Sequence, residues 1–309
     1  MSEKQYDLTI IGGGPAGLTA GLYAARSQLD VVLLEKGSLG GQVLTTEWVE
    51  NYPGFPEGIG GTELMERMRD QAVRFGLQIQ QANVTNVDLG GPVKKVDLAD
   101  GPPVTSRALI LASGAHPRKL GADGEAEFTG KGVSYCATCD GAFFTDAVIA
   151  VVGGGDMAVE EAVYLTKFGS KVYIIHRRDE LRATKVLQER ALDHPKIEMV
   201  WDSVVDSITG DDLVKEINLT NVKTGEKSAL QAEACFIFVG TLPLTGFVDG
   251  VLELNEQGFI VTDREMATNI PGVFAAGDCT NKTLRQISTA VGEGAAAAFS
   301  AEKYLESPH

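Results

Sequence analysis

The chain has 309 residues, of which 44% are hydrophobic and 22% are charged. This composition is typical of a globular protein, and the length leaves room for two domains of ordinary size. The formal net charge is −15, from 42 acidic and 27 basic residues, which argues against a nucleic acid or an anionic membrane surface as a partner.

The N-terminal segment favours a cytoplasmic protein. "MSEKQYDLTI" leads from a polar start directly into an expected strand, without the basic and apolar regions of a signal peptide. No run of about 18 apolar residues occurs, so we expect no membrane span. In a reducing compartment four cysteines are too few for a disulfide framework, and a Cys-x-x-Cys pair there is expected to be catalytic or metal-binding.

Two similar segments organise the chain. "LTIIGGGPAGLTAGLYAARSQLDVVLLEK" begins at Leu8, and "IAVVGGGDMAVEEAVYLTKFGSKVYIIHR" begins at Ile149. Each predicts a strand, a Gly-rich turn, a helix and a second strand, which is the βαβ unit of dinucleotide-binding domains. When the two turns are aligned, the matching positions are Gly12 with Gly153, Gly14 with Gly155, Gly17 with Ala158, and Glu35 with His176.

The first unit is expected to bind an adenosine nucleotide whose ribose has a free 2′-hydroxyl group. The first glycine of the turn permits the tight bend, the second lets the backbone approach a pyrophosphate, and the third lets helix and strand pack closely. Glu35 ends the second strand, where a carboxylate accepts a hydrogen bond from a ribose 2′-OH. This pattern suits FAD or NAD.

The second unit carries basic residues where the first carries Glu35. Guanidinium groups pair with phosphate, whereas a carboxylate would repel a 2′-phosphate, so this unit should prefer NADPH to NADH. The alternative is an ordinary solvated basic segment at a helix start. The candidate residues are Gly153, Gly155, Asp156, His176, Arg177, Arg178 and Arg182.

The remaining segments divide the chain into domains. "ALILASGAHPR" near residue 110 predicts a strand followed by the breakers Gly114 and Pro117, and a second break falls in "VGTLPLTG". "TNIPGVFAAGDC" then predicts a strand ending at Asp278, before a long Ala-rich helix. We therefore expect an α/β protein with two Rossmann-like domains, in which residues 117–244 are inserted between residues 1–116 and 245–309.

"YCATCDG", residues 135–141, holds two of the four cysteines. Cys136 and Cys139 have the spacing of a small redox disulfide, in which one thiol often has a lowered pKa. Zinc would need four ligands, and neither the isolated Cys235 and Cys279 nor the four histidines show ligand spacing. A structural disulfide is disfavoured because so short a loop loses little chain entropy on closure. Cys235 and Cys279 are expected to be buried, structural residues.

Several motifs in order resemble one family. "GGGPAG", "GGQ", "CATCDG", "GGGDMAVEEA", "HRRDELRA", "PGVFAAGD" and "RQISTAVGEG" together are similar to bacterial-type, low-molecular-weight thioredoxin reductase, over essentially the whole chain. The chain departs from the usual pattern at Met157, where a small hydroxyl residue is common, and at Leu244, where an Asn is often found.

The resemblance implies a homodimer with FAD in the outer domain and NADPH in the inserted domain. It places the flavin ring near Gln42 and Asn51 and its ribityl chain near Asp278, with Arg285 and Gln286 at the pyrimidine edge. The FAD residues that it implies are Gly12, Gly14, Pro15, Gly17, Glu35, Gln42, Asn51, Ala112, Ser113, Gly114, Asp278, Arg285 and Gln286.

The resemblance also implies a path for electrons, from NADPH to FAD, then to the cysteine pair, then to oxidised thioredoxin. Cys139 would lie nearest the flavin, and Cys136 would attack the protein substrate. Asp140 would protonate a leaving thiolate, which requires a carboxyl pKa raised by partial burial. Because one domain would carry both the cysteines and the nicotinamide, it should rotate about hinges near residues 115–118 and 244–248.

Other interpretations stay open at this point. The same scaffold could reduce a different protein disulfide, such as that of a peroxiredoxin partner, or use another electron donor. A flavin-binding redox sensor without turnover is a third hypothesis. Asp140 and Asp278 could be simple turn formers, and Phe143 and Phe144 could belong either to a docking surface for thioredoxin or to the core.

Overall fold

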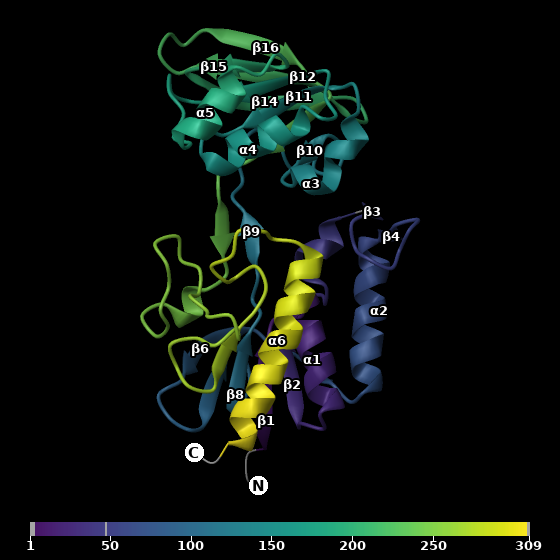
Figure 1. Cartoon of the computed structure of the whole chain (residues 1–309), viewed down its shortest axis with the longest axis vertical. Coiled ribbons are helices and arrows are strands. Elements are labelled where there is room, and N and C mark those ends of the chain that lie inside the picture. Colours follow the sequence, from purple (N-terminus) through teal and green to yellow (C-terminus); the bar gives the residue numbers. More distant parts are fainter. Residues whose placement is uncertain (1–3, 47, 308–309) are drawn as a thin grey trace. The chain divides into compact units, whose positions relative to one another are not determined.

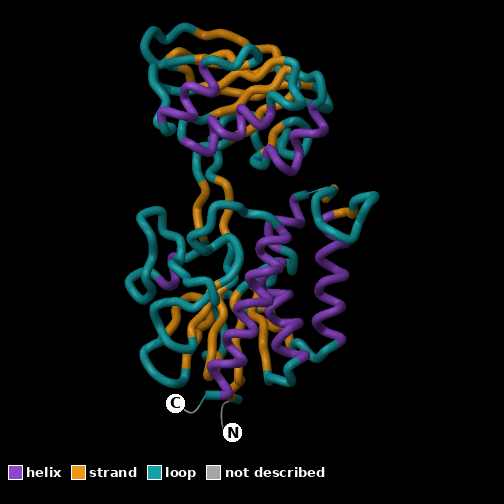
Figure 2. Tube along the Cα trace, in the orientation of Figure 1, coloured by secondary structure: helices purple, strands orange, loops and turns teal. Residues whose placement is uncertain are grey.

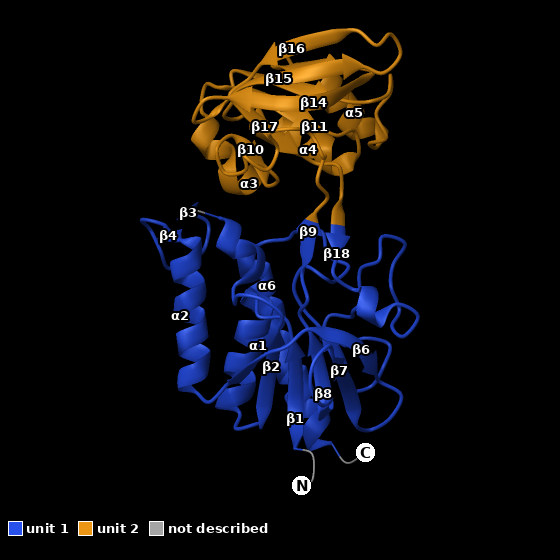
Figure 3. Cartoon of the chain, turned by 180° about the vertical axis from the view of Figure 1, so that it is seen from behind, with its two compact units in different colours: residues 1–116, 242–309 blue, residues 117–241 orange. Residues whose placement is uncertain are grey.

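The computed structural model describes residues 4–46 and 48–307. The chain forms two compact units: unit 1 comprises Met1–His116 and Leu242–His309, and unit 2 comprises Pro117–Thr241 (Figure 3). The chain passes between them twice, and the two crossing segments, β9 (Ala115–Pro117) and β18 (Thr241–Pro243), pair with each other.

Unit 1 is built on a mixed sheet with the strand order β5-β2-β1-β8-β7-β6, and β19 also pairs with β8. The pairs that involve β1, β2, β5 and β19 are parallel, whereas β6 and β7 add an antiparallel hairpin to β8. The strands are β1 (Gln5–Ile11), β2 (Val31–Glu35), β5 (Gln78–Gln81), β6 (Val84–Asp88), β7 (Lys94–Leu98), β8 (Val104–Leu111) and β19 (Val273–Ala275).

Helices cover one face of this sheet. In Figure 1, α1 (Pro15–Arg26) and α6 (Ile287–Glu306) run side by side over the strands, and α2 (Gly61–Arg74) packs on α1. Alternate residues of the strands fill two cores, as the period of two predicts: Leu8 and Ile10 face α1 and α6, whereas Ile11 and Leu111 pack with Ile260 on the opposite face. The shorter elements of unit 1 are η1 (Gly41–Thr45), β3 (Trp48–Val49), β4 (Ile59–Gly60) and η3 (Gly246–Val248).

Unit 2 contains a parallel sheet with the order β10-β17-β11-β12-β13. The helices α4 (Asp156–Leu165) and α5 (Lys185–Leu192) pack on one face, and an antiparallel sheet covers the other, as the separation of helices and strands in Figure 2 shows. The parallel strands are β10 (Val133–Ser134), β11 (Val148–Val152), β12 (Lys171–Ile175), β13 (Ile197–Val200) and β17 (Ala234–Ile237). The antiparallel strands are β14 (Ser203–Gly210), β15 (Val214–Asn221) and β16 (Lys227–Gln231).

The predicted fold class is confirmed. Each Gly-rich turn joins a central strand to a helix, β1 to α1 in unit 1 and β11 to α4 in unit 2. One strand is shorter than predicted, because β19 ends at Ala275 and not at Asp278. The amide of Gly277 donates to the Glu293 carboxylate (2.8 Å) in place of a neighbouring strand. Within the described ranges no helix combines the length and apolar character needed to cross a membrane.

Candidate active site

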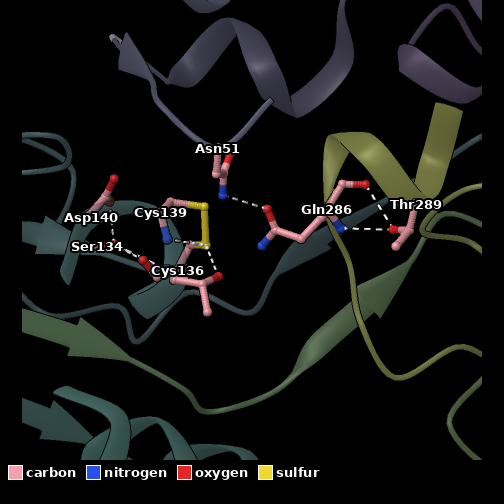
Figure 4. The surroundings of a disulfide bond; sticks show 8 residues. Asn51, Ser134, Cys136, Cys139, Asp140, Gln286 and Thr289 are labelled. Atoms are coloured by element: carbon pink, nitrogen blue, oxygen red, sulfur yellow. Dashed lines mark hydrogen bonds between the residues drawn. A yellow bond between two sulfur atoms is a disulfide. The ribbon is translucent and has the colours of Figure 1, made fainter. Parts of the chain in front are cut away.

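The two cysteines of the Cys-x-x-Cys pair are joined in a disulfide (Figure 4). Cys136 precedes the short helix α3 (Ala137–Asp140) as its N-cap, Cys139 lies within that helix, and their Cα atoms are 5.3 Å apart. The amide of Cys139 donates to Cys136 Sγ (3.2 Å), and Thr138 Oγ1 lies 3.4 Å from the same sulfur. Both cysteines are only partly buried. Helix geometry therefore brings together two sulfurs that remain open to a reaction partner.

A hydroxyl links the cysteine pair to Asp140. Ser134 Oγ donates to Asp140 Oδ2 (2.6 Å) and accepts from the amide of Cys136 (3.1 Å). Burial raises the pKa of the Asp140 carboxyl, and the hydrogen bond from Ser134 lowers it only in part. The raised pKa has the direction that a proton donor needs. Ser134 is absent from the sequence-based site, although its place two residues before Cys136 could have drawn attention to it.

The other two cysteines are buried and unpaired, as predicted. Cys235 lies in the middle of β17, where burial raises the pKa of its thiol to about 12. Burial also raises the pKa of Cys279. Both thiols are therefore held in the neutral form, which is a poor nucleophile.

The two phenylalanines after the pair have different environments. Phe143 is 54% exposed. Phe144 packs edge-on against Phe236 in the core of unit 2, with ring centroids 5.7 Å apart. Phe144 is thus a core residue, and Phe143 is the exposed aromatic side chain beside the disulfide helix.

In unit 1 the Gly-rich turn is packed as tightly as its sequence predicts. Gly12 has φ 108°, a conformation that disfavours other residues, and a Cβ there would lie 2.2 Å from the carbonyl oxygen of Ala112. A Cβ at Gly17 would lie 1.8 Å from the carbonyl oxygen of Gly12. Glu35 Oε2 accepts a hydrogen bond from the amide of Gly13 (2.7 Å), which ties the end of β2 to the turn.

Gly14, by contrast, faces open space. Among residues 4–46 and 48–307, no atom lies within 4 Å of where its Cβ would be, and no side chain caps the start of α1. The first amides of a helix have no acceptor within the helix, so they can bind an anion here. Pro15 is the first residue of α1, and Gly41, next to Gln42, lies against Gly14. The turn therefore fits a pyrophosphate group.

Two buried polar atoms of unit 1 fit a ligand beside this turn. Ser113 Oγ and Asp278 Oδ1 are buried, and within the described residues neither makes a hydrogen bond, although Lys282 Nζ lies 3.3 Å from Asp278 Oδ1. The two residues lie just beyond the neighbouring strands β8 and β19, near Ala112 and Gly114. Hydroxyl groups of a ligand could satisfy both atoms.

The start of α6 holds the last group of FAD candidates. Gln286 is the N-cap, and it forms a reciprocal capping box with Thr289. Asn51 Nδ2 donates to Gln286 Oε1 (3.1 Å), which joins residues distant in sequence (Figure 4). Arg285 donates to the carbonyl oxygens of Asp278 (3.4 Å) and Thr280 (3.3 Å) and stacks on Phe259.

In unit 2 the second Gly-rich turn has a similar arrangement. Gly155 is the N-cap of α4, without a side-chain cap, and no atom of the described residues lies within 4 Å of where its Cβ would be. The His176 ring is buried against Gly154, 2.4 Å from where that residue's Cβ would be. Burial and then the neighbouring guanidinium groups lower the pKa of His176, so it is neutral near pH 7. Its Nε2 makes no hydrogen bond in the described part of the chain.

The predicted arginines lie in the segment after β12. Arg177, Arg178 and Arg182 are exposed, and within residues 4–46 and 48–307 none of their guanidinium groups forms an ion pair with a carboxylate. The nearby Asp179 pairs with Lys223 (2.6 Å). The guanidinium groups are therefore available to an anionic ligand, and the structure places them in the same unit as Gly153 and Gly155.

Comparisons with known proteins agree with this geometry. Residues 6–294 match the family model described as pyridine nucleotide-disulphide oxidoreductase. A protein named thioredoxin reductase from Peptoclostridium acidaminophilum is 47% identical, over 98% of both chains. The crystal structure of thioredoxin reductase from Streptococcus pyogenes has 47% identity and a TM-score of 0.94, with 99% of both chains covered. That of Lactococcus lactis thioredoxin reductase, described as the FR conformation, has 48% identity and a TM-score of 0.67, with 97% and 99% covered.

The match thus extends over almost the whole chain, and it includes both Gly-rich turns and the cysteine pair. The chain belongs to the pyridine nucleotide-disulphide oxidoreductase family and, within it, to the thioredoxin reductases.

Proposed function

We propose that this protein is an NADPH-dependent flavoprotein that reduces the disulfide of oxidised thioredoxin through Cys136 and Cys139. The observation that carries the proposal is the partly exposed disulfide beside a carboxyl group whose pKa burial raises. A disulfide in this setting can be opened and closed repeatedly, whereas burial shields the neutral thiols of Cys235 and Cys279 from reaction partners.

Unit 1 is the FAD domain in this proposal. The open space at Gly14 and the uncapped start of α1 suit the pyrophosphate, and Glu35 suits the adenosine ribose. The buried oxygens of Ser113 and Asp278 suit hydroxyl groups of the ligand. The start of α6, with Arg285, would stabilise negative charge on the flavin ring system if the ring lies there.

Unit 2 is the NADPH domain. Gly155 and the start of α4 suit the second pyrophosphate, and the unpaired guanidinium groups after β12 suit the 2′-phosphate. Met157 is 43% exposed next to this turn, so its larger side chain does not disturb the core.

When bound, FAD and NADPH would supply the two electrons that reduce the Cys136–Cys139 disulfide. The S–S bond would break and the two sulfurs would take up two protons, one from the transferred hydride and one from solvent, after which Cys136 would lose its proton to become the thiolate. The Cys136 thiolate then attacks one sulfur of the thioredoxin disulfide, and Cys139 attacks Cys136 to release reduced thioredoxin. Asp140 gives its proton to a leaving thiolate, a role for which a raised carboxyl pKa is suited.

The protein works as a cytoplasmic homodimer, and unit 2 rotates relative to unit 1 during turnover. We place the hinges near residues 115–118 and 244–248, where the first range overlaps β9 and the second directly follows β18. Two relatives of nearly equal identity match the whole chain with TM-scores of 0.94 and 0.67, a spread expected among proteins whose domains move as bodies. Leu244, 45% exposed, is the first residue of the second hinge range, 244–248.

An anaerobic titration tests the function. The purified chain should be yellow, its flavin should bleach with a stoichiometric amount of NADPH but poorly with NADH, and the colour should return on adding oxidised thioredoxin. A colourless chain that does not take up FAD would refute the proposal. If the flavin colour returns with a peroxiredoxin-type disulfide but not with thioredoxin, the protein substrate is that disulfide and not thioredoxin. A flavin that is not reoxidised by either would indicate a redox sensor.

A further inference from the structure

The segment between β12 and α5 carries the three arginines without regular secondary structure of its own. Residues 176–184 form bends and loop, and Arg177, Arg178 and Arg182 point their side chains from this segment into solvent. A loop that must place three charged groups needs anchors outside itself, since an unanchored loop would lose entropy on binding.

Two hydrogen bonds anchor the loop to the second Gly-rich turn. The amide of Arg182 donates to the carbonyl oxygen of Gly154 (2.7 Å), and the amide of Thr184 donates to Asp156 Oδ1 (2.6 Å). Asp156 is exposed and is the first residue of α4. It is the residue of the turn that contributes a side chain to this anchoring.

The first repeat achieves the same connection in another way. There Glu35, at the end of β2, accepts from the amide of Gly13 and so holds its own segment on the turn. The position that corresponds to Asp156 is Pro15, which follows Gly14 as Asp156 follows Gly155. In the first repeat the linking carboxylate thus lies on the segment after the second strand, whereas in the second repeat it lies on the Gly-rich turn.

The charge of the expected ligand explains why the carboxylate lies on the turn in the second repeat. A carboxylate at position 176 would repel a 2′-phosphate, so the second repeat has a neutral His176 there, which packs on Gly154. A carboxylate at Asp156 can fasten the arginine loop from the turn, and at the first turn of α4 the helix dipole favours its negative charge.

We propose that Asp156 is a positioning residue that holds the arginine loop on the Gly-rich turn and thereby sets the preference for a 2′-phosphorylated nucleotide. The inference rests on the proposed function of unit 2 as the NADPH domain. It assigns to Asp156 a contact with Thr184 of its own chain in place of a contact with the nucleotide.

Calorimetric titration of the full-length, FAD-loaded chain with adenosine 2′,5′-bisphosphate and with AMP tests the inference. The measured quantity is the ratio of the two affinities, which is independent of turnover. Asp156→Ala removes the acceptor, and we expect the ratio to fall about 5- to 10-fold, as for one lost hydrogen bond. Asp156→Asn keeps an acceptor oxygen for the Thr184 amide, so it should retain most of the preference.

A second pair of variants removes the donor and leaves α4 intact. Thr184 has φ −60°, a value that proline adopts, so Thr184→Pro deletes the N–H without straining the φ of residue 184 itself. It should lower the ratio as Asp156→Ala does, whereas Thr184→Ala, which keeps the N–H, should not.

The outcomes separate the two proposals. If the wild-type chain prefers the bisphosphate and both Asp156→Ala and Thr184→Pro keep that preference, the positioning role is wrong and the NADPH domain stands. If Asp156→Asn loses as much as Asp156→Ala, charge and not the contact matters, and the positioning role is again wrong. If the wild-type chain has no preference for the bisphosphate, the NADPH assignment falls, and the inference falls with it.

Discussion

A methyl group placed on the open side of each Gly-rich turn should block one cofactor and leave the fold intact. Gly14 and Gly155 have φ −78° and −91° with extended ψ, so alanine adopts the same backbone conformation. In the part of the chain that the structure describes, no atom lies within 4 Å of where either Cβ would be. Alanine restricts the unfolded chain but caps a helix less well than glycine, so the free energy of unfolding should change by less than about 1 kcal/mol.

The cost should appear in binding. The new methyl group would fill part of the open space at the turn, where we place the pyrophosphate. Losing two charge-assisted hydrogen bonds of about 1.5 kcal/mol each amounts to about 3 kcal/mol, or roughly 150-fold in affinity. Gly155→Ala should therefore weaken NADP⁺ binding about 150-fold while FAD stays bound. Gly14→Ala should be purified with little FAD.

The assays are calorimetric titration with NADP⁺ for Gly155→Ala and the flavin-to-polypeptide absorbance ratio for Gly14→Ala, each with urea unfolding. Gly292→Ala is the matched control, because Gly292 is exposed in α6 and also has open space at its Cβ position. It should keep both cofactors. Full FAD content in Gly14→Ala, or NADP⁺ binding within threefold of wild type in Gly155→Ala, would refute the pyrophosphate placement.

Three further predictions concern the disulfide and its neighbours. Cys136→Ser and Cys139→Ser should each abolish thioredoxin turnover while NADPH still bleaches the flavin in a stopped-flow assay; retained turnover in either would exclude the pair as the redox centre. Asp140→Asn should lower turnover about 10²- to 10⁴-fold. Burial raises the pKa of Asp140 in the native state above the ordinary value of 3.8, so the native state holds the proton at pH values where the unfolded state has lost it. Wild-type stability therefore falls as pH rises from the unfolded to the native pKa, and it remains lower above that range. Urea unfolding should therefore show the stability of Asp140→Asn relative to wild type increasing as pH is raised from about 4 to about 8, and a constant difference would contradict the raised pKa. Phe143→Ala should raise KM for thioredoxin with little change in stability, whereas Phe144→Ala, in contact with Phe236, should destabilise the fold by about 2 kcal/mol or more; equal effects on both quantities would contradict their assignment to surface and core.

The parts of the molecule that were predictable from sequence are those in which local geometry fixes the residue type. A strand, a tight turn and a helix require small residues at set spacing, so Gly12 and Gly17 identified the βαβ unit. In the structure a Cβ atom at these positions would lie only 2.2 and 1.8 Å from backbone carbonyl oxygens. The apolar run from Leu8 to Ile11 likewise predicted the strand, and the structure buries Leu8 and Ile10 on one face of the sheet and Ile11 on the other.

The parts that could not be predicted depend on loops and on long-range contacts. The hydrogen bonds from Ser134 to Asp140 and from Thr184 to Asp156 join irregular segments, and no periodic pattern encodes them. The contact of Asn51 with Gln286 unites distant parts of unit 1. The adjacent Phe143 and Phe144 differ in burial because a 3-10 turn sends consecutive side chains in different directions.

The two units have separate hydrophobic cores. The clusters around Leu8 and Leu111 belong to unit 1, those around Val151 and Ile217 belong to unit 2, and no buried residue is shared between the two sets in the described part of the chain. Denaturation need not then be a single cooperative event, so one melting temperature would describe neither unit. A nucleotide that binds one unit should delay the melting of that unit alone, and a calorimetric scan with each ligand in turn would assign every transition to its part of the chain.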